Sequence, residues 1–456
     1  MQYKNYRFFL IIMLSLSVFI SCQKNINAGG TTTPTPTPVA SANDKLEDTV
    51  LLDTRDIYLW YSQIPSTFNP RIYANPDSIM TAIHQYSIEP GFTAPVDRWS
   101  FAMRQTDWNN LSSGISGDFG IGAGFVSSTD LRVSSVQKAS PAGLAGIHRG
   151  WQIIKVNGST SITTSSADIN FLNTAIFSSQ STAFTFRKPD GSTVDITLNV
   201  ASYQEHPVFI DTVYTISSKK IGYMGFSSFL GDTIEISSEF NRVFNRFNVA
   251  GVNDVIIDLR YNGGGYVSVA QQLSNYLAPS SANGGLMMSQ KYNDKYTQYN
   301  TSANFSKLGP INLTRIFFIV GAGTASASEL TINNLKPYMD VKLVGQTTHG
   351  KPVAFFPIPV GDWYIFPVSI RSTNKNGDGN YFNGFTPDSH VGDGITQDWG
   401  DITETSLASA IKYITTGAFR LSSTPAYVEE PQVKSGNAIL QAHDFKGTII
   451  KNGIFK

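Results

Sequence analysis

The chain has 456 residues, and its 34 basic and 34 acidic side chains give a formal net charge of zero. Charged residues make up 15 % of the sequence, against about 25 % in an average soluble domain. A neutral, charge-poor chain is poorly suited to nucleic-acid binding, which depends on neutralising phosphates with Lys and Arg. The hydrophobic content of 41 % excludes a disordered chain, and the single cysteine excludes an intramolecular disulfide framework and a cysteine-based zinc site. At about 150 residues per domain, the length predicts roughly three domains.

The amino-terminal residues 1–21 have the composition of a targeting signal. Basic side chains precede an apolar run at 8–20, which is too short for a membrane-spanning helix of about 20 residues. Ser21 and the lone Cys22 follow directly, and this arrangement resembles the bacterial lipoprotein signal, in which the cysteine is lipidated. An ordinary secretory signal is the alternative. Both interpretations predict an extracytoplasmic protein, and lipidation of Cys22 predicts one anchored to a bacterial membrane, in the periplasm or at the cell surface.

Two further segments precede the first clear strand signals. Residues 22–43 are rich in Thr and Pro, cannot bury a core, and are predicted to form an extended linker. Residues 44–114 place apolar side chains at helical spacing, and Pro65, Pro70 and Pro76 divide them into short stretches. We expect a small amino-terminal helical domain, to which the sequence assigns no chemistry.

Residues 115–203 have the pattern of short strands separated by turns. A run S-P-A-x-x-A-G-I-x-x-G at 140–150, followed by V-N-G at 156–158, resembles a PDZ domain. Such a domain binds the carboxyl terminus of a peptide by strand addition and holds its carboxylate with backbone N–H groups of a loop. Another small β-rich module is the alternative. The resemblance implies a carboxylate loop at Phe119, Gly120, Ile121 and Gly122.

Residues 204–418 alternate between strand and helix patterns. The segments 254–259 and 315–320 are continuous apolar strands, typical of a sheet that is covered on both faces. We therefore predict an α/β core within a multidomain α+β chain, preceded by the helical and the PDZ-like domain. Residues 419–456 form a carboxyl-terminal extension to which the sequence assigns no role.

Two glycine-rich turns follow these strands, at the sheet edge where open α/β folds place their sites. The turn at 258–265 ends in three glycines, whose backbone N–H groups can approach a ligand, with a tight turn of no function as the alternative. The turn at 321–330 presents Ser326 and Ser328 ahead of a helix. Such a serine is either a nucleophile beside the helix N–H groups or a helix N-cap. The G-x-S-x-G motif of α/β-hydrolases does not occur in this turn.

Lys351 supports the catalytic interpretation because it lies in the apolar stretch at 350–357. Burial lowers the pKa of a lysine from its usual value near ~10.4, since it disfavours the ammonium form. A neutral lysine beside a serine can act as its general base without a histidine. The alternative is a surface lysine whose stem packs on apolar neighbours.

The motifs S-A-S-E at 326–329, T-x-G-K at 348–351 and D-L-R-x-N-x-G-G at 258–265 together resemble the C-terminal processing (tail-specific) serine peptidase family. That family carries a PDZ domain ahead of its α/β core and cuts proteins after recognising their carboxyl-terminal ends. The resemblance implies that Ser326 is the nucleophile and Lys351 its base, with neither a cofactor nor a metal ion. The implied oxyanion hole consists of the backbone N–H groups of Ala327 and of Gly264 or Gly265.

One position departs from the family pattern. Many members carry a glutamine four residues after the lysine to orient it, and here that position is Phe355. A hydroxyl of Ser328 or Thr348 is the candidate replacement. His349 shares a strand face with Lys351 and could compete as the base, although only Lys351 falls on the matching position.

The leading hypothesis from the sequence is a lipid-anchored serine endopeptidase. Its PDZ domain would bind exposed carboxyl-terminal tails of protein or peptide substrates, and its serine and lysine would cut them. The expected partners are therefore such substrates and, through the lipid anchor, a membrane, with no nucleic acid. Two alternatives stay open: a catalytically inactive peptide- or ligand-binding lipoprotein on the same scaffold, and a structural lipoprotein whose PDZ domain recruits partners.

Overall fold

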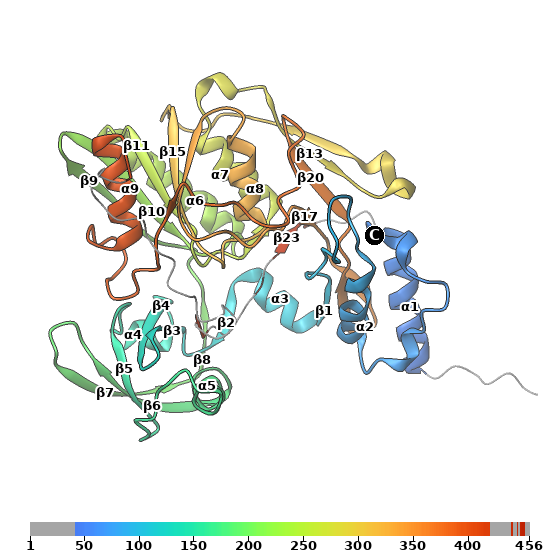
Figure 1. Ribbon diagram of the computed structural model, residues 1–456, viewed down its shortest axis with the longest axis horizontal. Coiled ribbons are helices and arrows are strands. Elements are labelled where there is room, and N and C mark those ends of the chain that lie inside the picture. The colour runs from blue at the N-terminus through green and yellow to red at the C-terminus, as the bar shows by residue number, and fades with distance from the viewer. Residues whose placement is uncertain (1–41, 420–438, 441–444, 446, 452–456) are drawn as a thin grey trace, which may run out of the picture. The chain divides into compact units, whose positions relative to one another are not determined.

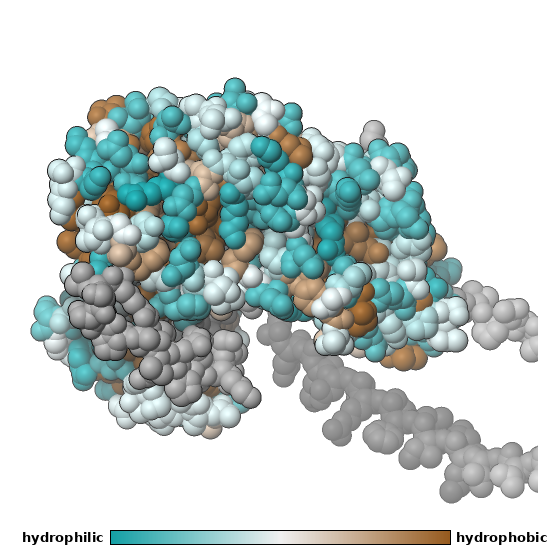
Figure 2. All heavy atoms as spheres, turned by 45° about the horizontal axis from the view of Figure 1, so that its top comes forward, coloured by the Kyte–Doolittle hydropathy of each residue, from teal (hydrophilic) through white to brown (hydrophobic). Residues whose placement is uncertain are grey.

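The computed structural model describes residues 42–419, 439–440, 445 and 447–451. The predicted signal peptide, Cys22 and nearly all of the predicted linker lie outside the described residues. Among the helices that are described, none is both long and apolar enough to cross a membrane. Hydrophilic residues cover much of the face shown in Figure 2, and hydrophobic residues appear between them in small groups.

The first part of the described chain is mainly helical and packs on the core. Asn75 begins the second helix: its side-chain oxygen accepts a hydrogen bond from Ser78 N at 2.9 Å, with Pro76 in the first turn. Buried apolar side chains of this part belong to the same hydrophobic cluster as those of the core. Its strand β1 pairs antiparallel with β19, and β19 with β18. The elements are α1 (Ala42–Ile57), α2 (Pro76–Ile83), β1 (Phe101–Arg104), α3 (Gln105–Ser113), β18 (Ile358–Val360) and β19 (Trp363–Phe366).

Residues 115–204 form a β-rich part with a hydrophobic cluster of its own. Its main sheet has the order β22-β3-β4-β5-β6-β7, and β2 pairs with β8. Ser140 begins the short helix α4 by accepting a hydrogen bond from Gly143 N at 3.2 Å, which gives the S-P-A motif a structural role. The elements are β2 (Ile115–Asp118), β3 (Ile121–Ser127), β4 (Asp130–Val136), α4 (Pro141–Leu144), β5 (Gln152–Val156), α5 (Ser166–Asn173), β6 (Ser181–Arg187), β7 (Thr193–Asn199), β8 (Ala201–Gln204) and β22 (Ile439–Leu440).

The core is built on a sheet of the order β21-β16-β15-β11-β10-β9, in which only the edge strand β9 of this sheet runs antiparallel to its neighbour. Helices cover both faces: α6, α7 and α8 contribute to one hydrophobic cluster and α9 to another (Figure 1). The strands are β9 (Val208–Ile216), β10 (Lys219–Phe226), β11 (Asp254–Asp258), β15 (Arg315–Val320), β16 (Asp340–Gly345) and β21 (Ser389–His390). The helices are α6 (Thr233–Ala250), α7 (Val267–Leu277), α8 (Ala327–Leu335) and α9 (Thr405–Thr416).

Two smaller sheets complete the described chain. One has the order β14-β13-β20-β17, and the other pairs β12 in parallel with β23 from the carboxyl-terminal extension. The pairing brings the last described strand to the glycine turn that follows β11. The strands are β12 (Gly264–Tyr266), β13 (Leu286–Lys291), β14 (Thr301–Asn304), β17 (Val353–Ala354), β20 (Ile370–Asn374) and β23 (Gly447–Ile449).

Candidate active site

Ser326 occupies the N-cap position of α8, in the turn that follows the buried strand β15. It is 0 % exposed, and its backbone adopts φ 62° and ψ −109°. A positive φ is uncommon for a residue that has a Cβ, costs on the order of 1–3 kcal/mol, and is concentrated at functional sites. Ser326 is therefore both the start of the helix and a residue held in a strained conformation.

Glu329 joins the two predicted catalytic residues. Its Oε2 accepts hydrogen bonds from the backbone N–H of Ser326 and from that of Lys351, each at 2.8 Å. Its Oε1 accepts from Thr348 Oγ1 at 2.5 Å and from Gly350 N at 2.6 Å. Burial raises the pKa of Glu329, while these four hydrogen bonds act in the opposite direction. One buried carboxylate thus brings the serine turn and the lysine loop together.

The side chain of Lys351 lies among aromatic rings. Lys351 is 1 % exposed, which excludes the surface position that the alternative interpretation requires. Its Nζ lies 3.6 Å from the ring centroid of Phe355 and 5.9 Å from that of Trp99. Burial lowers the pKa of Lys351 well below its usual value, and the negative charges of Asp97 and Glu329 oppose that shift. The environment therefore favours the neutral amine.

The two hydroxyl groups considered as partners for the lysine each donate a hydrogen bond to another group. Ser328 Oγ donates to the backbone oxygen of Asn262 at 3.0 Å. Thr348 Oγ1 donates to Glu329 and accepts from Phe385 N at 2.7 Å. Phe355, at the position where many family members carry glutamine, instead places its ring against the amine.

His349, the competing base, is held by a tryptophan. Trp99 Nε1 donates to His349 Nε2 at 2.9 Å. Because an indole N–H can only donate, Nε2 is the acceptor, and a neutral His349 carries its proton on Nδ1. Trp99 belongs to the segment to which the sequence assigned no chemistry. Its contact with both His349 and Lys351 depends on tertiary packing, so no local signal could have revealed it.

The glycine turn approaches the serine closely. Gly264 has φ 105°, and a Cβ at this position would lie 2.9 Å from both Ser326 Cβ and Ala327 N, so a side chain cannot be accommodated. Asn262 Oδ1 accepts the backbone N–H of Gly264 at 2.9 Å. The Gly264 N–H is therefore committed within the turn, and Gly265 and Ala327 are the better candidates for the oxyanion hole.

The carboxyl-terminal extension reaches this site, although the sequence assigned it no role. Thr448 Oγ1 and Ser326 Oγ are hydrogen-bonded. Thr448 is buried, and in the ladder between β12 and β23 it lies opposite Gly265. More than a hundred residues separate Thr448 from Ser326 in the sequence, and no motif marks the extension, so sequence reasoning missed this contact.

The predicted carboxylate loop borders the same cavity as the glycine turn. A cavity of about 180 Å³ is lined by Gly120, Ile121 and Gly122 on one side and by Gly263 and Gly264 on the other. Within the loop, Gly120 N donates to the side chain of Asp118, the residue just before the loop, at 2.7 Å, so this N–H is already hydrogen-bonded. Phe119, also assigned to the loop, is buried in the cluster of the β-rich part.

A buried ionic network connects the β-rich part with the glycine turn. Arg149 Nη2 lies 2.6 Å from Asp393 Oδ1, and Arg260 Nη1 lies 2.8 Å from the same oxygen. Arg260 also pairs with Asp258 at 2.8 Å and with Glu404 at 2.9 Å. Burial alone would raise the pKa of Asp393, but the charges of Arg149 and Arg260 lower it to about 2. Among the described residues, no group of three or more His, Cys, Asp or Glu side chains is placed to hold a metal ion.

A Ser–Lys hydrolase uses a serine and a lysine with a lowered pKa, and here a serine at a strand-to-helix turn and a buried lysine donate backbone N–H groups to the same carboxylate. Residues 220–391 match the family model of Peptidase family S41. This match covers Ser326, Lys351 and both glycine-rich turns, and it confirms the family resemblance inferred from the motifs.

Two curated relatives also carry the names of proteases of this kind. The chain is 27 % identical over 260 residues to a probable CtpA-like serine protease of Staphylococcus aureus (strain N315), covering 56 % of this chain and 49 % of the relative. It is 25 % identical over 275 residues to the carboxy-terminal processing protease CtpB of Bacillus subtilis (strain 168), covering 58 % and 54 %. The chain thus spans about half the length of these curated relatives.

A solved structure supports the predicted fold class. This chain superposes on the structure of a protein described as an S41 protease, from Bacteroides fragilis NCTC 9343, with a TM-score of 0.65 at 24 % sequence identity. The match covers 80 % of this chain and 97 % of that protein. The predicted combination of an α/β core with further helical and β-rich parts is confirmed.

Proposed function

We propose that this chain is a serine endopeptidase in which Ser326 is the nucleophile and Lys351 its general base. The observation that carries the proposal is the shared acceptor: one oxygen of Glu329 binds the backbone N–H groups of both residues. The lowered pKa of the buried Lys351 supports it further, because only the neutral amine can accept a proton.

The proposed reaction uses the groups named above. Ser326 Oγ attacks the carbonyl carbon of the scissile peptide bond while the Lys351 amine accepts the hydroxyl proton. The backbone N–H groups of Ala327 and Gly265 stabilise the oxyanion, and the Lys351 ammonium returns its proton to the leaving amine. Water then hydrolyses the acyl-enzyme with the neutral lysine again acting as the base. No cofactor is required in this sequence of steps.

For the substrate, we propose an exposed carboxyl-terminal tail that binds to residues 115–203 acting as a PDZ domain. Strand β3 begins at Ile121, within the loop 119–122, so that the loop leads into the strand as strand addition requires. The cavity shared by this loop and the glycine turn offers a route from one site to the other. Lipidation of Cys22 and anchoring to a bacterial membrane stay part of the proposal. Replacing Cys22 by Ala is expected to release the protein from the membrane fraction.

The second candidate is a peptide-binding protein on the same scaffold without catalysis. Phe355 favours it, because the phenyl ring cannot hydrogen-bond the lysine as a glutamine amide can. A serine-reactive phosphonate separates the two candidates, since it forms a covalent bond only with an activated serine.

Labelling by a diphenyl phosphonate and hydrolysis of an unstructured peptide test the proposed enzyme. We expect labelling at Ser326, none in Ser326→Ala, much slower labelling in Lys351→Met, and unchanged labelling in the matched control Ser409→Ala on the distant helix α9. Because Thr448 contacts Ser326, both assays are repeated in a full chain that carries Ile449→Glu. Hydrolysis retained by Ser326→Ala would overturn the assignment, and so would an unlabelled Ser326 in both backgrounds.

A further inference from the structure

The carboxyl-terminal strand β23 lies in a groove with main-chain hydrogen bonds on both sides. We call this the catalytic groove because it leads to Ser326. One wall is the glycine turn 263–266, and the other is the main chain at Phe355, which pairs in parallel with Ile449. Main-chain pairing of this kind binds extended peptides regardless of their sequence. The bonds are Gly447 N to Gly263 O (3.0 Å), Phe355 N to Thr448 O (3.0 Å) and Ile450 N to Phe355 O (3.1 Å).

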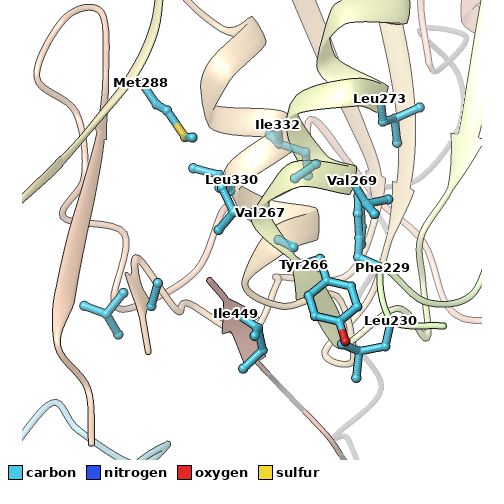
Figure 3. Packing of buried hydrophobic residues seen from close by; sticks show 14 of the residues in the cluster. Phe229, Leu230, Tyr266, Val267, Val269, Leu273, Met288, Leu330, Ile332 and Ile449 are labelled. Atoms are coloured by element: carbon cyan, nitrogen blue, oxygen red, sulfur yellow. The ribbon is translucent and has the colours of Figure 1, made fainter. Parts of the chain in front are cut away.

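Side chains of the same segment fill apolar pockets beside the groove. Ile449 is 1 % exposed and lies in the cluster that contains Tyr266 and Val267, where Figure 3 shows it beside Tyr266. The ring of Phe445 lies 5.8 Å from that of Trp108 and 6.2 Å from that of Phe101. The segment is therefore held by specific side-chain burial in addition to its main-chain bonds.

The contact with the nucleophile is direct. The Thr448 hydroxyl is hydrogen-bonded to Ser326 Oγ, and both residues are buried. A peptide carbonyl that reacts must approach Ser326 Oγ through the space that Thr448 fills. The segment consequently occupies the position from which a substrate carbonyl would reach Ser326 in the proposed reaction.

The extension also adds a strand, β22, to the main sheet of the β-rich part. Backbone pairing joins β22 antiparallel to β3, with Ile439 opposite Gly124 and Leu440 opposite Ala123. In this orientation the extension runs toward the loop 119–122, as the end of a bound peptide would. The edge proposed for substrate tails is thus paired with the chain's own extension.

We propose that the segment described by Phe445 and residues 447–451 is a built-in peptide ligand of the catalytic groove and holds the full chain in a self-inhibited state. The pairing of β22 with β3 lets a substrate tail that binds at β3 compete with the extension. The inhibition rests on the proposed function. The binding of the segment rests on the contacts described above and does not require catalysis.

The order of the contacts explains why the extension acts as an inhibitor rather than as a substrate. A substrate whose carboxyl terminus is bound at 119–122 presents its scissile bond upstream of the residues paired with β3. In the extension, the residue at Ser326 is Thr448, which lies downstream of the paired residues 439–440. The extension therefore meets the two sites in the opposite order.

Binding of a fluorescent synthetic peptide with the sequence of residues 443–456 tests the proposal without requiring cleavage. The peptide is titrated against full chains that carry Ser326→Ala, with or without Ile449→Glu. A glutamate in the buried apolar pocket is expected to release the tethered segment and to tighten peptide binding about tenfold or more. The matched control is Ile234→Glu, because Ile234 is 80 % exposed on α6 and a glutamate there stays in water. Equal affinity for the Ile449→Glu and Ile234→Glu chains would overturn the proposal.

Two measurements on chains with the native Ser326 complete the test. We expect Ile449→Glu to raise the rate of phosphonate labelling about tenfold or more relative to Ile234→Glu, and the added peptide to reverse that gain. The intact mass of the native chain is expected to equal that of Ser326→Ala after the change of residue is subtracted. Loss of the extension only in the native chain would overturn the proposal, since the segment would then be a substrate. If Ser326 is never labelled but peptide binding responds to Ile449→Glu, the proposed function fails while the assignment of the groove ligand stands.

Discussion

Ser326 and Lys351 donate their backbone N–H groups to the same atom, Glu329 Oε2, and both donor–acceptor distances are 2.8 Å. Glu329 is itself the third residue of α8, so the helix that begins at Ser326 also carries the acceptor for the lysine loop. The shared acceptor couples the backbone conformation of the two residues. Displacing Glu329 would move both.

Glu329→Gln tests this coupling. All four groups that bind the carboxylate are donors, and the amide nitrogen of glutamine cannot accept any of them. We expect unfolding in urea to show a loss of about 1–3 kcal/mol, the cost of leaving buried donors unpaired, together with a fall in kcat for peptide hydrolysis. Unchanged stability and unchanged kcat would show that Glu329 does not position the pair.

The stability of the protein should depend on pH through Lys351. Burial lowers the pKa of Lys351 in the folded state, so the unfolded chain binds more protons between that lowered pKa and the usual value of 10.5. Stability must therefore rise with pH across this window. Lys351→Met removes the dependence and is expected to be more stable than the native chain at neutral pH. Urea unfolding from pH 6 to 10 should show the two curves converging as the pH rises.

Phe355→Leu is expected to lower the pKa of Lys351, which the pH dependence of peptide hydrolysis reports. The aromatic ring 3.6 Å from Lys351 Nζ attracts the ammonium form and opposes the effect of burial by about 1–2 kcal/mol. Leucine keeps the site apolar and keeps the main-chain bonds of residue 355, but it removes that attraction. The acidic limb of the pH profile of kcat/KM should move to lower pH. A limb that stays in place would mean that the ring does not influence the base.

Particular residues show what the sequence could predict here and what it could not. The strands around Ser326 and the glycine turns could be predicted from local apolar runs and from motifs. A buried parallel strand and the turn after it are both determined by residues that are adjacent in the sequence. Trp99 and Thr448 reach the site only through tertiary packing, and neither lies in a periodic pattern or a motif. The hydrogen bond from Gly264 N to Asn262 Oδ1 could not be predicted either, since it depends on the rotamer of a side chain within the turn.

His349→Gln distinguishes the two possible bases. The Nε2 atom of His349 already accepts the indole N–H of Trp99, so it is not available for the serine proton. Glutamine can accept the same hydrogen bond through its side-chain oxygen and should preserve the position of Trp99. We expect kcat to stay within about threefold of the native value, whereas general-base loss in Lys351→Met should lower it by about a hundredfold or more. The opposite ranking of the two variants would make His349 the base.

Asp393→Asn tests the network between the β-rich part and the glycine turn. The carboxylate pairs with Arg149 and Arg260, and its folded pKa of about 2 lies below the ordinary value of 3.8. A lowered carboxyl pKa contributes stability that is present above 3.8 and is lost as the pH falls through about 2, amounting to about 2 kcal/mol at neutral pH. Asparagine cannot supply the charge, so the variant should be less stable by at least that amount at pH 7. Acid unfolding of the two proteins should bring their stabilities closer as the pH approaches 2, because the native carboxylate is then protonated as well. A difference that does not depend on pH would show that packing, and not charge, is what Asp393 contributes.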